Sequence, residues 1–237
     1  MKNKRKILIL SSILAFVLAL SIFCVIYVSD FYRYIPDQDA NSYEIKYLED
    51  DTIVFEAENA TAAFIFYPGG KVEYKSYIPL MKNLSDNGIT CLLVDMPFNL
   101  AVLDVNRAKG LQEKFPNIKN WYIGGHSLGG SMAASYLSNN IDMYEGLILL
   151  GSYSTVDFSN TEIKVLSIYG SNDLIMNREK YEQYKTNIDD NLKEIIIDGG
   201  NHAYYGMYGN QDGDGNATIT NRKQIEITTE YIIDFIK

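Results

Sequence analysis

The sequence predicts one α/β domain with a doubly wound, mostly parallel sheet and helices on both of its faces. Short apolar runs rich in β-branched and aromatic residues alternate with helix-like stretches of about 10–15 residues. Runs such as 64–66 and 147–150 are apolar at successive positions, which is typical of strands covered on both faces. The 237 residues, 47% of them hydrophobic, suit a single domain of ordinary size. The expected strands are 43–48, 52–57, 62–67, 90–95, 121–125, 146–150, 165–169 and 194–198, and the expected helices are 74–87, 105–115, 128–138, 177–187 and 221–236.

The N-terminal residues form a segment of a different kind. Four basic residues at positions 2–6 precede residues 7–28, which contain no charge, proline or glycine. As a helix, residues 7–28 would span about 33 Å, enough to cross the hydrocarbon core of a bilayer with the basic end in the cytoplasm. A cleaved signal peptide, which would make the domain a secreted protein, and a buried core helix are the alternatives. The predicted organisation is a cytoplasmic basic tip and transmembrane anchor at 1–28, a stalk at 29–42 and an extracytoplasmic α/β domain at 43–237.

Within the domain, the order of the elements sets their expected pairing. The first two runs, 43–48 and 52–57, are expected to form an antiparallel hairpin at the sheet edge, turning near residues 49–51. The later runs are separated by helix-like stretches, so they are expected to lie parallel. The last helix begins after Thr218 or Thr220, either of which can act as its N-cap.

Charge and cysteine content exclude several classes of function. Outside residues 1–28 the chain has 17 basic against 30 acidic side chains, a net charge near −13. Such a surface repels phosphate backbones and anionic lipid headgroups, so nucleic-acid binding is not expected. Cys24 and Cys91 are far apart in sequence and context, which excludes a disulfide framework and a cysteine-based metal site. We expect no metal and no cofactor.

The pentapeptide Gly125-His126-Ser127-Leu128-Gly129 lies between an expected strand and an expected helix. Small residues flank the serine because the chain must turn from strand to helix within one or two residues. This strained turn lifts the serine hydroxyl above the sheet, so Ser127 is the candidate nucleophile. A plain glycine-rich turn is the alternative interpretation, and a phosphate-binding loop is disfavoured because no lysine follows.

A serine hydroxyl needs a base to act as a nucleophile near neutral pH. The chain has two histidines; His126 must point away from the neighbouring serine, which leaves His202, just after the last expected strand. The acid that orients it is expected to be Asp173, which follows another strand, with Asp157 as the second choice. The order Ser127, Asp173, His202 is the one typical of such hydrolytic sites.

A developing oxyanion requires two backbone N–H donors. One is expected from Leu128, the residue after the nucleophile, and the other from the loop Pro68-Gly69-Gly70-Lys71. Gly70 is the first choice and Lys71 the second.

These motifs together resemble the α/β-hydrolase superfamily, and more narrowly a bacterial membrane-anchored or secreted family related to the dienelactone hydrolases. The resemblance rests on FIFYPGGK (64–71), GITCLLVDMPFNLA (88–101), GGHSLGG (124–130), YGSNDLI (169–175) and the block 199–224. It implies the α/β-hydrolase fold and cleavage of an ester or similar acyl bond. Dienelactone hydrolases use a cysteine nucleophile where this chain has Ser127.

Three further patterns refine the expected site. Only 14 residues separate the strands that end at residue 150 and begin at residue 165, too few for a lid domain. The Asp- and Gly-rich segment 210–216 departs from a calcium-binding loop at its first and twelfth positions, so we expect a turn. Four tyrosines follow or flank the candidate loops and either line a shallow pocket or pack in the core: Tyr153, Tyr204, Tyr205 and Tyr208.

We therefore expect a serine hydrolase, carboxylesterase-like, that cleaves acyl esters of small soluble substrates through an acyl-enzyme. The alternatives are an acyltransferase or amidase that acts on cell-envelope material, or a non-catalytic surface-binding module. The expected partners are a small-molecule ester and, through the N-terminal helix, the membrane; the oligomeric state is not defined by the sequence.

Overall fold

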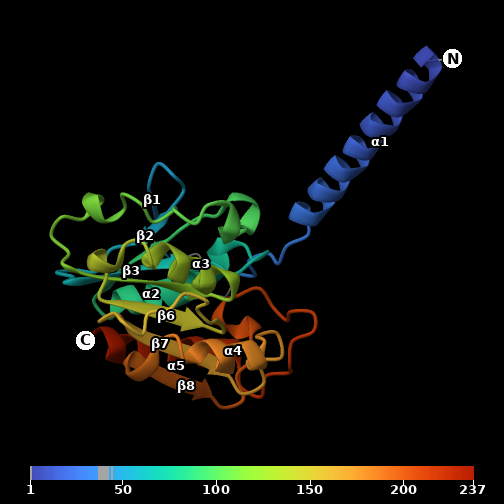
Figure 1. Ribbon diagram of the computed structural model, residues 1–237. Helices are drawn as coiled ribbons and strands as arrows, with labels where there is room; N and C mark the ends of the chain where they lie inside the picture. Colours follow the sequence, from blue (N-terminus) through green and yellow to red (C-terminus); the bar gives the residue numbers. More distant parts are fainter. Residues whose placement is uncertain (1, 37–42, 44) are drawn as a thin grey trace. The chain divides into compact units, whose positions relative to one another are not determined.

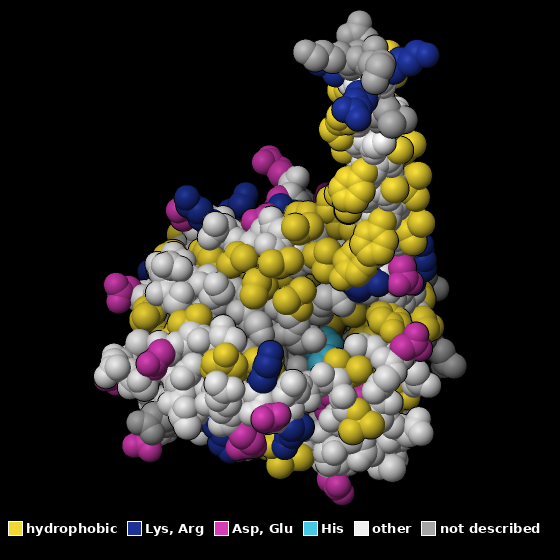
Figure 2. Space-filling view, turned by 45° about the vertical axis from the view of Figure 1, so that its right-hand side comes forward, with side chains coloured by type: hydrophobic (Ala, Val, Ile, Leu, Met, Phe, Trp, Pro, Cys, Tyr) yellow, Lys and Arg dark blue, Asp and Glu magenta, His cyan; other side chains and the backbone are white. Residues whose placement is uncertain are grey.

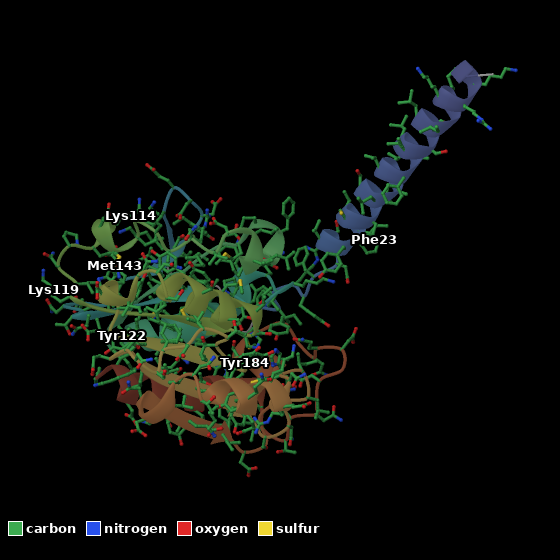
Figure 3. All side chains as sticks on the ribbon, in the orientation of Figure 1. Phe23, Lys114, Lys119, Tyr122, Met143 and Tyr184 are labelled. Carbon is green, nitrogen blue, oxygen red and sulfur yellow. The ribbon has the colours of Figure 1, made fainter. Side chains whose placement is uncertain are left out.

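The computed structural model describes residues 2–36, 43 and 45–237. The chain divides into two units, residues 1–31 and residues 32–237 (Figure 1). The first unit contains the helix α1 (Lys2–Ser29), of which residues Lys4–Ser29 are long and apolar enough to cross a membrane. Its apolar side chains, such as Phe23 in Figure 3, are exposed around the helix. An anchor and a signal sequence share these features.

The second unit is built on an eight-stranded sheet with the order β1-β2-β4-β3-β5-β6-β7-β8. The first two strands pair antiparallel, β1 with β2 and β2 with β4, and the remaining pairs are parallel. The predicted hairpin and the predicted parallel sheet are thus confirmed, although residues 37–42 of the predicted stalk and residue 44 of the first expected strand lie outside the described residues. The strands are β1 (Lys46–Tyr47), β2 (Ile53–Phe55), β3 (Ala62–Tyr67), β4 (Ile89–Leu93), β5 (Asn120–His126), β6 (Gly146–Leu150), β7 (Lys164–Gly170) and β8 (Leu192–Ile197).

Among the described residues, four α-helices accompany the sheet, and local capping explains where three of them begin. Pro79 stands in the first turn of the second helix, where its missing N–H costs nothing. The side chains of Asn177 and Thr220 accept hydrogen bonds from the backbone N–H of Lys180 and Lys223, so each caps a helix, and Thr220 is the N-cap of the last one. The helices are α2 (Ile78–Asp86), α3 (Leu128–Leu137), α4 (Arg178–Lys185) and α5 (Asn221–Ile236). Short 3₁₀ turns are η2 (Tyr74–Tyr77), η3 (Pro97–Asn99), η4 (Ala101–Leu103), η5 (Gln112–Lys114), η6 (Ile141–Met143), η7 (Asp189–Asn191) and η8 (Ala203–Tyr205).

Both faces of the sheet are buried. Phe64 on β3 points into a core shared with α2 and α5, whereas its neighbour Ile65 points into a second core shared with α3. Figure 1 shows α3 on one side of the sheet and α2 on the other. Burial on both sides explains why the strands read as continuous apolar runs.

The predicted helix at 105–115 is wrong. The segment forms turns and ends in η5, because its polar backbone groups bond to a side chain of the sheet. The hydroxyl of Tyr67 donates to the carbonyl of Val105 at 2.8 Å and accepts from the N–H of Ala108 at 2.9 Å. Gly110, with φ of 79°, then turns the chain away from a helical path.

The parallel strands determine where the loops meet. Because β3, β5, β6, β7 and β8 run in the same direction, the loops that follow them lie at one edge of the sheet. Lys114, Lys119 and Met143, labelled in Figure 3, mark the opposite edge, where strands β5 and β6 begin.

Candidate active site

Ser127 occupies the single residue between β5 and α3, with φ of 51° and ψ of −122°. A left-handed φ at a non-glycine residue is strained, and neighbouring glycines make the turn possible. A Cβ atom on Gly125 would lie 2.2 Å from the carbonyl oxygen of Tyr67, and one on Gly129 would lie 2.2 Å from that of Pro68. The sequence therefore adopts the strand–turn–helix geometry that presents a serine hydroxyl at the end of a strand.

His202 and Asp173 form a buried pair. Nδ1 of His202 lies 2.8 Å from Oδ2 of Asp173, and the two residues are only 1% and 4% exposed. The other oxygen, Oδ1, accepts backbone N–H bonds from Ile175 at 2.9 Å and Met176 at 2.8 Å. The carboxylate is thereby fixed, and it holds the imidazole with Nδ1–H toward Asp173 and Nε2 available as a base. The second candidate acid, Asp157, is exposed and accepts from Ser159 instead.

Ser127 and His202 line the same cavity, which has a volume of about 270 Å³. Nε2 of His202 is buried and has no hydrogen-bond partner within the part of the chain that the structure describes. Figure 2 shows a histidine at the bottom of a surface hollow with hydrophobic side chains around it. The segment between β6 and β7 contains no helix or strand and adds no lid. The remaining lining residues are Leu128, Ser131, Gly151, Ser152, Tyr153, Ile175, Met176 and Asn177.

The two first-choice oxyanion donors are brought together. A Cβ atom on Gly70 would lie 3.0 Å from Cδ2 and 3.3 Å from Cβ of Leu128, so the glycine permits this close approach. The backbone N–H of Lys71, the second choice on that loop, instead donates to the carbonyl of Asn99 at 2.8 Å. The structure thus brings Gly70 beside Leu128, whereas the N–H of Lys71 is already engaged by Asn99.

His126 belongs to a buried network beside the site. Its Nδ1 lies 2.8 Å from the hydroxyl of Tyr77, which also accepts the N–H of Gly69 at 3.1 Å. Since that hydroxyl has one proton, it must donate to Nδ1, which requires a neutral His126 protonated on Nε2. Burial, followed by the nearby charge of His202, holds the pKa of His126 well below its ordinary value. The network links the nucleophile turn to the Gly70 loop, and sequence reasoning missed Tyr77 because it lies 49 residues from its partner.

Asp214 and Gln224, also missed, hold the loops of the acid and the base. The Asp214 carboxylate accepts the N–H of Leu174 at 3.3 Å and that of Ala203 at 2.9 Å, the residues that follow Asp173 and His202. Gln224 binds both backbone groups of Asn201, its Oε1 accepting at 3.0 Å and its Nε2 donating at 2.8 Å. In the sequence, the one signal for the role of Asp214 was its position between Gly213 and Gly215 in the segment 210–216.

Of the four tyrosines singled out in the sequence, Tyr153 lines the cavity. Its ring stacks on Tyr184 of α4, labelled in Figure 3, with centroids 5.8 Å apart and an angle of 8° between the planes. Tyr205 and Tyr208 are buried in the core, and the Tyr204 hydroxyl bonds to Asn210. Among the described residues, no group of three or more His, Cys, Asp or Glu side chains could hold a metal ion.

Comparison with known proteins agrees with this geometry. Residues 63–226 match the model of the alpha/beta hydrolase family. The chain belongs to the alpha/beta hydrolase family. As an alpha/beta hydrolase it is an enzyme of the hydrolase type. No curated protein sequence matches it.

Several solved structures share the fold of this alpha/beta hydrolase at low sequence identity. A dienelactone hydrolase from Anabaena variabilis has a TM-score of 0.60 at 12% identity, covering 82% of this chain and 99% of that one. Est1E from Butyrivibrio proteoclasticus has a TM-score of 0.56 at 16% identity, covering 81% and 98%. The esterase Est2 from Thermogutta terrifontis has a TM-score of 0.57 at 14% identity, covering 81% and 92%. The predicted relationship to dienelactone hydrolases is thus confirmed at the level of the fold.

Proposed function

We propose that this alpha/beta hydrolase is a serine carboxylesterase that acts through an acyl-enzyme. The observation that carries the proposal is the buried His202–Asp173 pair, joined at 2.8 Å, which opens on the same cavity as the strained Ser127. One structural neighbour, Est2 from Thermogutta terrifontis, is an esterase, which supports the choice of substrate class.

In the acylation step, Oγ of Ser127 attacks the ester carbonyl carbon while Nε2 of His202 takes its proton. The carbonyl oxygen becomes an oxyanion and accepts the backbone N–H bonds of Gly70 and Leu128. Asp173 stabilises the imidazolium that forms. The ester C–O bond then breaks, and His202 returns its proton to the leaving alcohol.

In the deacylation step, a water molecule gives a proton to Nε2 of His202 and attacks the acyl carbon. The second tetrahedral intermediate uses the same two N–H donors. It collapses when His202 protonates Oγ of Ser127, which releases the free acid.

The size of the site supports a small substrate. The cavity of about 270 Å³ is lined by Tyr153, Ile175 and Met176, which offer apolar contact to a short acyl group. The absence of a helix between β6 and β7 agrees with access for water-soluble esters.

We further propose that α1 is an uncleaved single-pass anchor in the cell membrane, with the enzyme on the outer side. The basic residues at positions 2–6 favour a cytoplasmic N-terminus. Protease treatment of intact cells, which should degrade an outward-facing domain and spare a cytoplasmic one, tests the orientation.

A fluorophosphonate probe tests the chemistry, because it reacts covalently with activated serines. The full chain in detergent should be labelled, and Ser127→Ala should lose both the label and the turnover of p-nitrophenyl acetate. Ser131→Ala is the matched control, since Ser131 lines the same cavity and should leave the labelling intact. An unlabelled wild-type protein that also fails to cleave p-nitrophenyl acetate and butyrate would contradict the proposal.

A further inference from the structure

The chain that follows α1 binds the loop carrying the Gly70 donor. Tyr32 pairs with Val72 as a parallel bridge: its N–H donates to the carbonyl of Lys71 at 2.8 Å, and its carbonyl accepts the N–H of Glu73 at 2.9 Å. The N–H of Tyr34 also donates to the Glu73 carboxylate at 2.9 Å. We name residues 32–35 the strap; it lies within the second unit of the chain.

The strap also binds the loop that follows His202. The N–H of Ile35 donates to the carbonyl of Met207 at 2.8 Å, and the hydroxyl of Tyr32 accepts the N–H of Asp212 at 3.0 Å. The ring of Tyr32 packs against Tyr208, with centroids 5.6 Å apart. The strap therefore joins the Gly70 loop to the loop that follows His202, although many residues of sequence separate it from both.

The Gly70 loop adopts a conformation that needs such support. Lys71 has φ of 58°, a left-handed value that is unfavourable for a residue with a side chain. Its peptide groups are bound on both sides, the N–H by the carbonyl of Asn99 at 2.8 Å and the carbonyl by the N–H of Tyr32. One of the two groups that hold Lys71 in this conformation thus comes from the strap.

The strained turn controls the direction of the Gly70 N–H. The N–H of Val72 donates to the carbonyl of Gly69 at 3.2 Å. The carbonyl of Gly69 and the N–H of Gly70 belong to one planar trans peptide unit and point in opposite directions. A contact that holds Val72 in place therefore also sets the direction of the Gly70 N–H. Val72 lies between Lys71 and Glu73, the two residues whose backbone groups bond to Tyr32.

We propose that the strap is a positioning element of the active site, which holds the Gly70 N–H in place for the oxyanion. This inference rests on the proposed function, because it assumes that Gly70 is an oxyanion donor. Loss of one such donor lowers kcat by about 10²–10³-fold. A donor that is present but loosely held costs less, so loss of the strap should lower kcat by about 10- to 100-fold.

The test replaces residues 32–35 by Gly-Ser-Gly-Ser in the full chain, purified in detergent. Activity is expressed per active site titrated with a fluorophosphonate, so that unfolded protein does not count. We expect kcat to fall by about 10- to 100-fold while KM changes less than threefold. The inhibition constant of an alkylboronic acid, which forms a tetrahedral adduct on the serine, should rise by the same factor as kcat/KM falls.

Two point variants separate positioning from a general loss of structure. Tyr32→Pro and Tyr32→Ala both remove the ring and the hydroxyl, but only proline also removes the N–H that binds Lys71, so kcat should be several-fold lower in Tyr32→Pro than in Tyr32→Ala. Pro36→Ala, at an exposed position just beyond the strap, is the control with unchanged activity.

Equal kcat and equal boronate affinity in the Gly-Ser variant and the wild type would overturn the proposal. If the Gly-Ser variant has no titratable sites, equal values for Tyr32→Pro and Tyr32→Ala would overturn it instead. Failure of the proposed function gives a different result, because the unaltered chain would then not react with the probe at all.

Discussion

Tyr77→Phe is the substitution for which the structure predicts the clearest double effect. The side chain is fully buried, and its hydroxyl joins the N–H of Gly69 at 3.1 Å to Nδ1 of His126 at 2.8 Å. Phenylalanine fits the same space but leaves both of these groups without a partner. Each buried unsatisfied group costs about 1–3 kcal/mol. Because the two groups share one partner, we expect a combined loss of about 2–4 kcal/mol in the free energy of unfolding.

This loss should be visible in thermal unfolding of the full chain in detergent. For a domain of about 200 residues, 1 kcal/mol shifts Tm by about 2–4 °C, so Tm should fall by roughly 5–15 °C. Below the transition, kcat per titrated site should fall by about tenfold, because the Gly69 N–H no longer steadies the loop that carries Gly70. Tyr204→Phe is the matched control: its hydroxyl bond to Asn210 is exposed, and Tm should move by less than 2 °C. A Tm for Tyr77→Phe within 2 °C of the wild type would refute the reasoning.

Three further outcomes are expected. His126 stays neutral when folded because burial and then the His202 charge lower its pKa, so its contribution to stability is present above pH 6.5 and is lost as pH falls below that value. The free energy of unfolding, measured with urea, should therefore fall less steeply between pH 6.5 and 5 in His126→Gln than in the wild type, by up to about 1.4 kcal/mol per pH unit. Equal slopes in the two proteins would contradict this. Asp173→Asn should lower kcat on p-nitrophenyl acetate by about 10³–10⁴-fold, because the imidazole loses the acceptor that orients it, while Asp157→Asn should not. Asp214→Ala should lower kcat by about tenfold, since two backbone N–H groups beside the acid and the base lose their acceptor, and wild-type kcat in that variant would exclude this supporting role.

The sheet and the nucleophile turn could be predicted because their signals are local. Burial on both faces leaves continuous apolar runs, and the turn at Ser127 needs glycines within two residues of the serine. Asp173 and His202 could also be predicted, since each lies in the loop after a strand, and the two strands end at the same edge of the sheet. The helix at 105–115 failed because its backbone groups bond to Tyr67, 38 residues before Val105.

From the residues alone we could predict the order of the strands and of most helices, the turn at Ser127, and the short list of groups that could serve as acid and base. Which loops meet at the site, and which side chains hold them, depends instead on contacts between residues far apart in the sequence. Tyr77 contacts His126 from 49 residues away, Asp214 bridges to Leu174 across 40, and Tyr34 reaches Glu73 across 39. Loops have no repeating pattern of backbone hydrogen bonds, so their N–H and carbonyl groups take partners that only the folded chain brings within reach.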